Sequence, residues 1–366
     1  MTPTLIMAGG VESVPMENRR ADALAGVLIG TAVGDALGLP MEGLTAQRQP
    51  RLFPPPLRHR LIGRYGMISD DTEHSLMLAQ ALLECPADPT AFQRALARRL
   101  RWWLMGLPAG VGFATLRAIL KLWVGIPPSH SGVMSAGNGP AMRTALLGVY
   151  FADNAERRRQ FVAASARITH RDPRAELAAL AVAETSAWMA EQRDDVDALL
   201  QSLTNLSELV EWAAILAKVG PGLSRGQPTA NFTFEMGMER GVSGYAFQSV
   251  PVAIYAALRQ RNDFEAALTE AIACGGDTDT VGAITGALVG ARVGVAGIPA
   301  PWRDAIVEWP RSLTLLHRVG ERLSQQLETP SVFGPVPYFW PAVPLRNLAF
   351  LAIVLTHGFR RLLPPY

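Results

Sequence analysis

The sequence contains very little cysteine, lysine or net charge. Cys85 and Cys274 are the only cysteines among 366 residues, too few for a disulfide framework or a cysteine-based zinc site. This usage fits a reducing compartment, and we expect a cytoplasmic protein. Only Lys121 and Lys218 among the 34 basic residues are lysines, and the formal net charge is +2. A chain so close to neutral carries no overall charge that would attract nucleic acid or a membrane, so we expect neither partner.

The sequence also lacks the patterns of a secreted or membrane-spanning chain. Residues 1–20 have neither the basic start nor the apolar core of a signal peptide, and we interpret them as a loose N-terminal extension. The apolar stretch 345–355 is too short to span a bilayer. The longer stretch 281–298 contains Arg292 and directly follows an acidic cluster, which argues against a membrane span.

Sustained alternation of apolar and polar residues, which is typical of strands, is rare in this sequence. Apolar residues at helical spacing dominate instead, and no segment resembles a linker between domains. The sequence therefore predicts one all-α domain over residues 21–366. Its expected helices include residues 21–39, 141–150, 263–274 and 302–327, and its expected loops include residues 220–231.

Two of the predicted helices carry glycine at regular intervals. Glycines 26, 30, 34 and 38 recur every four residues, and glycines 282, 286 and 290 repeat the pattern. A spacing of four places each set on one helix face, although each glycine costs about 1 kcal/mol relative to alanine. Close approach of two backbones is a reason to retain them, so we expect these two helices to lie side by side or to cross at the centre of the fold.

The second glycine-rich helix begins behind a cluster of carboxylates and hydroxyls, Gly275-Gly276-Asp277-Thr278-Asp279-Thr280. A single Asp or Thr at a helix start is explained by capping of free N–H groups. Two carboxylates beside Thr280 also suit a hard cation such as Mg²⁺ or Mn²⁺, which prefers oxygen ligands. Both interpretations remain open on the local sequence.

A second acidic cluster, Ser69-Asp70-Asp71-Thr72-Glu73, opens another apolar helix. Asp70 with Glu73 is compatible with a capping-box variant, but this leaves the neighbouring Asp71 unexplained. Adjacent carboxylates repel each other unless a cation holds them. We therefore predict that the two clusters face each other and hold divalent metal ions.

These two clusters resemble the metal-binding motifs of the ADP-ribosylglycohydrolases. Three further segments match that family in the same order: Gly34-Asp35-Ala36-Leu37-Gly38 with Glu42, Gly137-Asn138-Gly139-Pro140-Ala141-Met142-Arg143, and Thr169-His170-Arg171-Asp172-Pro173. The resemblance covers residues 21–296. Residues 299–366 match less well, and we expect them to pack on the domain or on a second subunit of a homo-oligomer.

The resemblance implies a single compact orthogonal all-α domain with a dinuclear metal cleft. It implies a hydrolase that cleaves the glycosidic bond of ADP-ribosyl groups on a protein or in a small ADP-ribose derivative, with two divalent cations, Mg²⁺ or Mn²⁺. The metal ligands would be Ser69, Asp70, Asp71, Asp277, Asp279 and Thr280. The catalytic residues would be Glu42, as gate or proton carrier, with Asp70, Asp71 and Asp279.

The same resemblance implies a set of residues that would bind the ADP-ribose: Gly112, Ser135, Gly137, Asn138, Gly139, His170 and Tyr245. Asp35, which lies inside the first apolar helix, would support the metal ligands from behind. Two alternatives are a crystallin-like member without activity and a module that binds ADP-ribose without cleaving it. The complete acidic set favours an enzyme.

Overall fold

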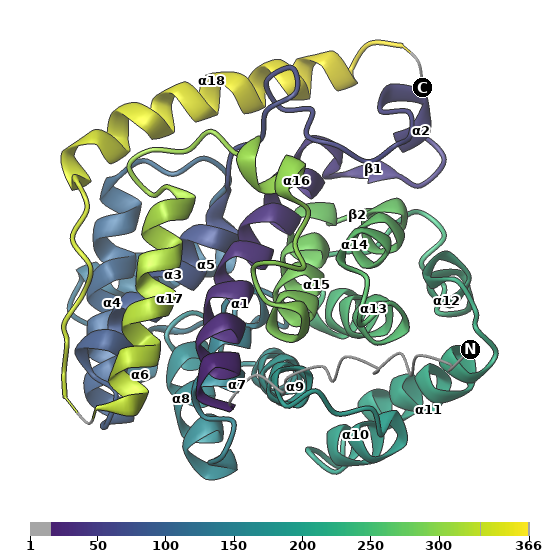
Figure 1. Cartoon of the computed structure of the whole chain (residues 1–366). Coiled ribbons are helices and arrows are strands. Elements are labelled where there is room, and N and C mark those ends of the chain that lie inside the picture. Colours follow the sequence, from purple (N-terminus) through teal and green to yellow (C-terminus); the bar gives the residue numbers. More distant parts are fainter. Residues whose placement is uncertain (1–15, 330, 365–366) are drawn as a thin grey trace, which may run out of the picture.

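A computed structural model describes residues 16–329 and 331–364. Its described part is built from α-helices, with one two-stranded sheet of two residues per strand (Figure 1). This confirms the predicted all-α fold. One continuous hydrophobic core extends through the helices, from Ala23 in the first helix to Val336 beyond the seventeenth.

The elements follow one another in this order: α1 (Met16–Gly38), η1 (Leu39–Met41), β1 (Leu44–Thr45), α2 (Gln49–Leu52), α3 (Asp70–Glu84), α4 (Pro89–Met105), α5 (Phe113–Trp123), α6 (Pro128–Ser131), η2 (Ala141–Arg143), α7 (Ala145–Tyr150), α8 (Ala155–Arg167), α9 (Pro173–Ala190), α10 (Val196–Thr204), α11 (Val210–Ser224), α12 (Thr229–Glu235), α13 (Ala246–Arg259), α14 (Phe264–Ala273), β2 (Gly275–Gly276), α15 (Thr278–Val293), α16 (Ala300–Asp304), α17 (Leu313–Glu328), η3 (Trp340–Ala342) and α18 (Val343–Arg361).

Helices α1 and α15 form the centre of the fold and contact each other more extensively than any other pair of elements. Their glycine faces meet directly: a Cβ atom added to Gly30 would lie 2.1 Å from the carbonyl oxygen of Gly286. Gly26 faces Gly290 and Gly34 faces Gly282 at the same close range. The predicted glycine contact between these two helices is therefore confirmed, and we call it the glycine seam.

Several predicted boundaries are wrong. Helix α1 begins at Met16, inside the predicted extension 1–20, whose first 15 residues lie outside the described part of the chain. The predicted helix 141–150 is divided into η2 and α7, and the predicted helix 302–327 into α16 and α17. The predicted loop 220–231 is helical at both ends, because α11 continues to Ser224 and α12 begins at Thr229.

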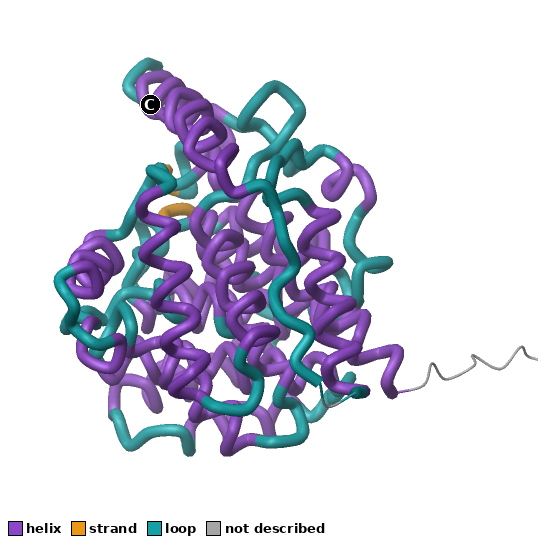
Figure 2. Tube along the Cα trace, turned by 90° about the vertical axis from the view of Figure 1, so that its left-hand side faces the viewer, coloured by secondary structure: helices purple, strands orange, loops and turns teal. Residues whose placement is uncertain are grey.

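Two helices in the described residues are long and apolar enough to cross a membrane by length and composition. The first, Arg19–Met41, has an apolar 18-residue window that is completely buried, as expected of the central helix of a folded domain. The second, Trp340–Arg361, covers α18, and only 28% of its apolar window is buried. It lies along one edge of the molecule, at the top of Figure 1, and Figure 2 shows it projecting beyond the other helices.

The inner face of α18 is attached to the body of the protein by polar contacts. The Asn347 side chain donates to the carbonyl oxygen of Gly106 at 2.7 Å, and a ring nitrogen of His357 lies 2.6 Å from the carbonyl oxygen of Leu61. At the end of the helix, Arg361 donates to the carbonyl oxygens of Leu39, Pro40 and Glu42. The helix therefore holds the backbone that leads into Glu42.

Candidate functional site

The first acidic cluster lies at the start of α3, where Ser69 is the N-cap residue. The Ser69 side chain makes no capping hydrogen bond; its hydroxyl lies 3.5 Å from Oδ2 of Asp71. Ser69 is 4% exposed and Asp71 is 1% exposed. A capping role therefore does not explain these residues, because their polar atoms turn toward each other and not toward the free N–H groups of the helix.

The second acidic cluster lies at the start of α15, and it faces the first. The Thr280 hydroxyl donates to Oδ2 of Asp71 at 3.3 Å, which joins two clusters that are 209 residues apart. Asp277, the N-cap residue of α15, makes no side-chain cap; its Oδ2 accepts a hydrogen bond of 2.6 Å from Asn138. The geometry thus brings the two acidic helix starts together, as the sequence predicted.

Asp35 on α1 supports the first cluster from behind. Its Oδ2 accepts hydrogen bonds from the backbone N–H groups of Ser69, at 2.8 Å, and Thr72, at 3.2 Å. The Thr72 hydroxyl donates to the same oxygen, at 2.5 Å. Asp35 therefore fixes the first turn of α3 and supplies the contacts that capping would supply elsewhere, and the predicted supporting role fits this position.

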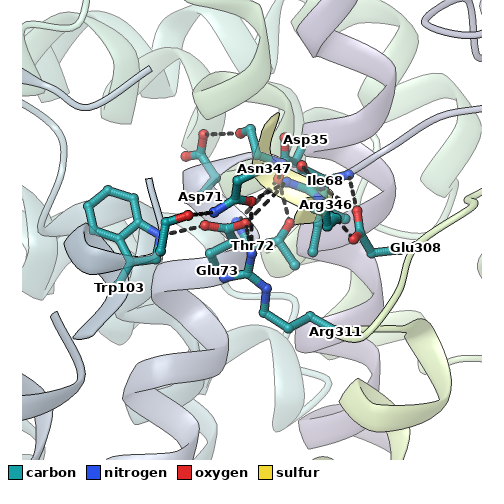
Figure 3. Close-up of polar contacts among 12 residues, drawn as sticks. Asp35, Ile68, Asp71, Thr72, Glu73, Trp103, Glu308, Arg311, Arg346 and Asn347 are labelled. Carbon is teal, nitrogen blue, oxygen red and sulfur yellow. Dashed lines mark hydrogen bonds and ion pairs between the residues drawn. The ribbon is translucent and has the colours of Figure 1, made fainter. Parts of the chain in front are cut away.

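Glu73 belongs to a buried ion cluster and not to a capping box (Figure 3). Its carboxylate contacts Arg311 at 2.5 Å and Arg346 at 3.4 Å, and it accepts a hydrogen bond from the Trp103 indole. Arg346, on α18, also binds Glu308 and donates to the carbonyl oxygen of Ile68 at 2.6 Å. These contacts attach Ile68, the residue before Ser69, to Arg346 on the C-terminal helix α18.

The two glycines before Asp277 make its position possible. Gly275 and Gly276 have φ angles of +75° and +83°, a region that other residues rarely adopt. A Cβ atom on Gly276 would lie 1.9 Å from the carbonyl oxygen of Val242. These glycines form strand β2, which pairs with Leu44–Thr45, and the N–H of Gly43 donates to Gly276. The small sheet therefore fixes the Glu42 turn beside Asp277.

A glycine loop and a histidine form the opposite part of the site. The ring of His170 lies against Gly137 and Gly139, where an added Cβ atom would meet it at 3.1 Å and 3.0 Å. The buried Arg143 holds this arrangement, because it donates to the carbonyl oxygen of Gly139 and to the Thr169 hydroxyl, both at 3.0 Å. The two glycines are thus required for the close packing of the loop on His170.

These elements surround a cleft of about 620 Å³. Most of the predicted site residues line it: Glu42, Asp70, Gly112, Ser135, Gly137, Asn138, Gly139, His170, Asp277, Asp279 and Thr280. Ser69 and Asp71 do not line the cleft and lie buried behind it. Tyr245 is adjacent through its backbone bridge to Gly137, but its hydroxyl contacts Glu211 at 2.8 Å and does not line the cleft.

Several residues that line the cleft were not among the predicted site residues, although the loop 106–115 resembles a family loop near the ligand; Phe113, in that loop, is the most conspicuous. Its side chain is 85% exposed, an unusual position for a large apolar residue at the start of a helix. It follows a glycine-containing turn at residues 106–112, and this combination of an aromatic residue with a glycine-containing turn is the signal that was available. The other lining residues to which the sequence assigned no role in the site are Gly43, Gly110, Ala114, Thr115, Met142, Val242, Ser243, Gly244 and Gly276.

The site places negative charges close together in poorly hydrated surroundings. Burial, followed by repulsion from neighbouring carboxylates, raises the pKa of Asp70, Asp71 and Asp279 well above the ordinary range. Burial also raises the pKa of Asp35 to about 6, although its hydrogen bonds oppose this effect. At Glu42, loss of hydration and then Asp277 raise the pKa, while the Arg361 guanidinium lowers it.

The donor chemistry of the site fits hard divalent cations. Oδ1 of Asp35 and Oδ1 of Asp71 are buried without any hydrogen-bond partner, which is costly for a carboxylate oxygen. A bound cation would satisfy such oxygens and relieve the repulsion between the acids. In the described residues, no three Asp, Glu, His or Cys side chains are already grouped closely enough for a metal. The hydroxyls of Ser69 and Thr280 would complete the ligand set.

Fold and cleft together define an all-α protein in which two acidic helix starts share one cleft. A family model described as ADP-ribosylglycohydrolase matches residues 16–331. The chain belongs to the ADP-ribosylglycohydrolase family, as the motifs predicted.

Relatives extend over most of the chain. A protein of Archaeoglobus fulgidus is 32% identical, over 76% of this chain and 90% of its own length. The ADP-ribosyl-[dinitrogen reductase] glycohydrolase of Rhodospirillum rubrum is 27% identical, over 77% and 89%. The ADP-ribosylhydrolase ARH3 of Gallus gallus is 28% identical, over 82% and 94%. A solved structure titled ADP-ribosylglycohydrolase-related protein complex is 29% identical with a TM-score of 0.62, over 85% of this chain and 99% of that chain.

Proposed function

We propose that this protein is a metal-dependent hydrolase that cleaves the glycosidic bond of ADP-ribosyl groups. The observation that carries the proposal is the contact between the two acidic helix starts, with the unpartnered oxygens of Asp35 and Asp71 beside it. The names of the related glycohydrolase and ADP-ribosylhydrolases support the same substrate class. No observation favours a crystallin-like or purely binding role.

Two divalent cations, Mg²⁺ or Mn²⁺, would be held by Ser69, Asp70, Asp71, Asp277, Asp279 and Thr280. When bound, they would polarise ribose hydroxyls and lower the pKa of a water molecule. The carboxylates of the protein act in the same direction, because positive charge develops on the sugar ring as the glycosidic bond breaks. Glu42 lies at the cleft, and its raised pKa favours a role in delivering or accepting a proton there.

The opposite wall would bind the nucleotide. Burial and then the positive charge of Arg143 lower the pKa of His170 to about 3, so the ring is neutral at physiological pH and serves as a hydrogen-bonding group. The exposed ring of Phe113 offers an apolar surface on which a nucleobase can stack. Asn138 is turned toward Asp277 and would connect the nucleotide wall to the acidic cluster.

The test is release of ADP-ribose from a panel of peptides and nucleotides modified on arginine, serine, other acceptor side chains or nucleic-acid ends. We expect turnover of at least one class with Mg²⁺ or Mn²⁺, and its loss on addition of a chelator. Anomalous scattering from crystals soaked in Mn²⁺ should place the cations between α3 and α15. Tight binding of ADP-ribose without turnover of any substrate would make the protein a binding module, and turnover in excess chelator would exclude the metal requirement.

A further inference from the structure

The outward face of α18 is apolar and has no partner in the described structure. Five large apolar side chains on this face are between 38% and 71% exposed: Leu345, Leu348, Leu351, Leu355 and Phe359. The exposed residues between Leu348 and Phe359 are apolar, glycine or threonine, and none is charged. Contiguous apolar surface of this kind marks a binding surface, since a folded chain ordinarily buries it.

The contacts of the inner face of α18 decide whether the helix can leave the protein body to reach a partner. Arg346 binds Glu73 and Glu308, and Asn347, His357 and Arg361 contact backbone carbonyl oxygens of the body. Crossing a bilayer would break all of these contacts, and the helix carries three arginines, Arg346, Arg360 and Arg361, which hydrocarbon disfavours. The helix is therefore fixed flat on the protein, and only its outer face is available.

Positive charge is concentrated beside this face, although the whole chain is close to neutral. Residues 43–69 and 329–366 together contain eight arginines and no Asp or Glu. Two of the eight have acidic partners outside these segments: Arg346 binds Glu73 and Glu308, and Arg361 lies beside Glu42. The two segments lie side by side. Arg48 donates to the carbonyl oxygen of Arg361, and a ring nitrogen of His357 lies 2.6 Å from the carbonyl oxygen of Leu61. In Figure 1 the loop after α2 rises next to α18. Four of these arginines are exposed: Arg51, Arg58, Arg64 and Arg360.

The acids of the neighbouring segment 300–311 do not neutralise this charge. Glu308 is bound to Arg346, with its side chain 1% exposed. Asp304 lies with Arg303 and Arg318 at a separate cavity. Burial, and then the positive charge of Arg58, lowers the pKa of Arg60.

We propose that the apolar face of α18 and the flanking arginines form a surface that binds an anionic lipid bilayer. Apolar side chains on one side of a helix enter the boundary of the acyl region, and arginines around them meet negative head groups. A second copy of the chain fits less well, because a two-fold contact would bring the same arginines together without any acid between them. A nucleic acid would use the arginines but would leave the apolar face exposed to water.

The experiment is sedimentation of the full chain with vesicles of phosphatidylcholine alone or with about 30 mol% phosphatidylglycerol. We expect binding to the anionic vesicles only, and weaker binding as the salt concentration rises. Arg58→Gln with Arg64→Gln should weaken binding at least about tenfold, because each arginine near the surface contributes roughly a fivefold factor. Leu348→Ser with Leu355→Ser should abolish it at any salt concentration.

Matched controls change similar residues elsewhere on the surface. Val210→Ser with Phe234→Ser removes two side chains that are 82% and 65% exposed on α11 and α12. Arg159→Gln with Arg240→Gln removes two exposed arginines. Both controls should bind as the unmodified chain does, and thermal melts should show that every variant is folded.

Three results would overturn the proposal. The first is that the chain stays in the supernatant with both kinds of vesicle. The second is a dimer that the Leu348→Ser, Leu355→Ser variant cannot form, which would assign the face to a second copy. The third is binding of duplex DNA through Arg58 and Arg64 without binding of vesicles. The proposal does not depend on the hydrolase activity, so vesicle binding and ADP-ribose release succeed or fail separately.

Discussion

The glycine seam allows a quantitative test with a single methyl group. In Gly30→Ala the new Cβ atom would lie 2.1 Å from the carbonyl oxygen of Gly286, whereas comfortable contact requires about 3.5 Å. The two helices would have to separate by about 1.4 Å. They cannot yield locally, because glycine contacts at Gly26 and Gly34 hold the backbones together on either side. Overpacking of this kind costs about 1–3 kcal/mol or more.

The intrinsic helix preference of alanine works in the opposite direction and favours the variant by about 1 kcal/mol. Gly358→Ala on α18 isolates this contribution, since an added Cβ atom there meets nothing within 4 Å. We expect Gly358→Ala to be neutral or stabilising and Gly30→Ala to lower the unfolding midpoint by several degrees. Urea unfolding of both variants, compared with the unmodified chain, measures the free energies.

A second readout follows from the geometry of the site. Asp35 belongs to α1 and Asp279 to α15, so separation of the helices moves the acid behind the site away from the acid in the cleft. Stabilisation by added Mg²⁺ should therefore decrease in Gly30→Ala and remain unchanged in Gly358→Ala. Equal unfolding free energies in the two variants would refute the claim that backbone contact at the seam requires glycine.

Three further predictions concern charged and titratable groups. Asp279→Asn should abolish turnover but remain folded, with a metal-free melting midpoint at or above that of the unmodified chain because a repelling charge is lost; normal turnover would exclude Asp279 from the site. Glu73→Gln should cost about 3–5 kcal/mol, because two buried arginines lose their counter-charge. Glu84→Gln, at a more exposed arginine pair, should lower the free energy of unfolding by at most about 1 kcal/mol. Equal losses of unfolding free energy in Glu73→Gln and Glu84→Gln, measured by urea unfolding, would contradict this prediction. The pKa of His170 is depressed to about 3, so its stabilising effect is complete above about pH 6.5 and is lost as pH falls toward 3. The stability difference between the unmodified chain and His170→Gln should therefore shrink as the pH is lowered over that window, and a pH-independent difference would contradict the shift.

The parts of the fold that could be predicted are those in which a residue type has one dominant physical reason. Glycine every fourth residue of a helix is a cost that close backbone contact explains, so the pairing of α1 with α15 followed from spacing alone. Asp71 lies next to another acid and had no capping role, which indicated a site. Both inferences used the local sequence and needed no knowledge of the tertiary structure.

The wrong predictions concern residues whose role depends on distant partners. Glu73 was compatible with a capping box, but its partners come from Trp103, Arg311 and Arg346. The predicted loop 220–231 contains glycine and proline, yet α11 continues into it as far as Ser224. There Gly222 lies against Tyr255, where an added Cβ atom would be only 2.9 Å from the hydroxyl. Tertiary packing in these cases overrides what the local residues favour.

The net charge of the whole chain also does not describe the charge of each local surface. A net charge of +2 predicted no membrane partner, and that expectation still stands as a prediction from composition. The fold brings two acid-free segments of the chain together at α18, so the local surface differs from the average. The vesicle experiment decides between the two inferences.

The glycines of the seam recur every four residues, so the two helices could in principle pack in more than one register. Shifting α1 by four residues along α15 would again place glycine opposite glycine at most positions, after a movement of about 6 Å. Such a shift would remove Asp35 from Ser69 and Thr72 and separate the acids of the site. The glycine contacts along the seam are thus equivalent to one another, except at one position. There Gly38 meets Thr278, whose hydroxyl donates to the Gly38 carbonyl oxygen at 2.8 Å. That hydrogen bond and the contacts of Asp35 are made in the register that brings the acids of the site together.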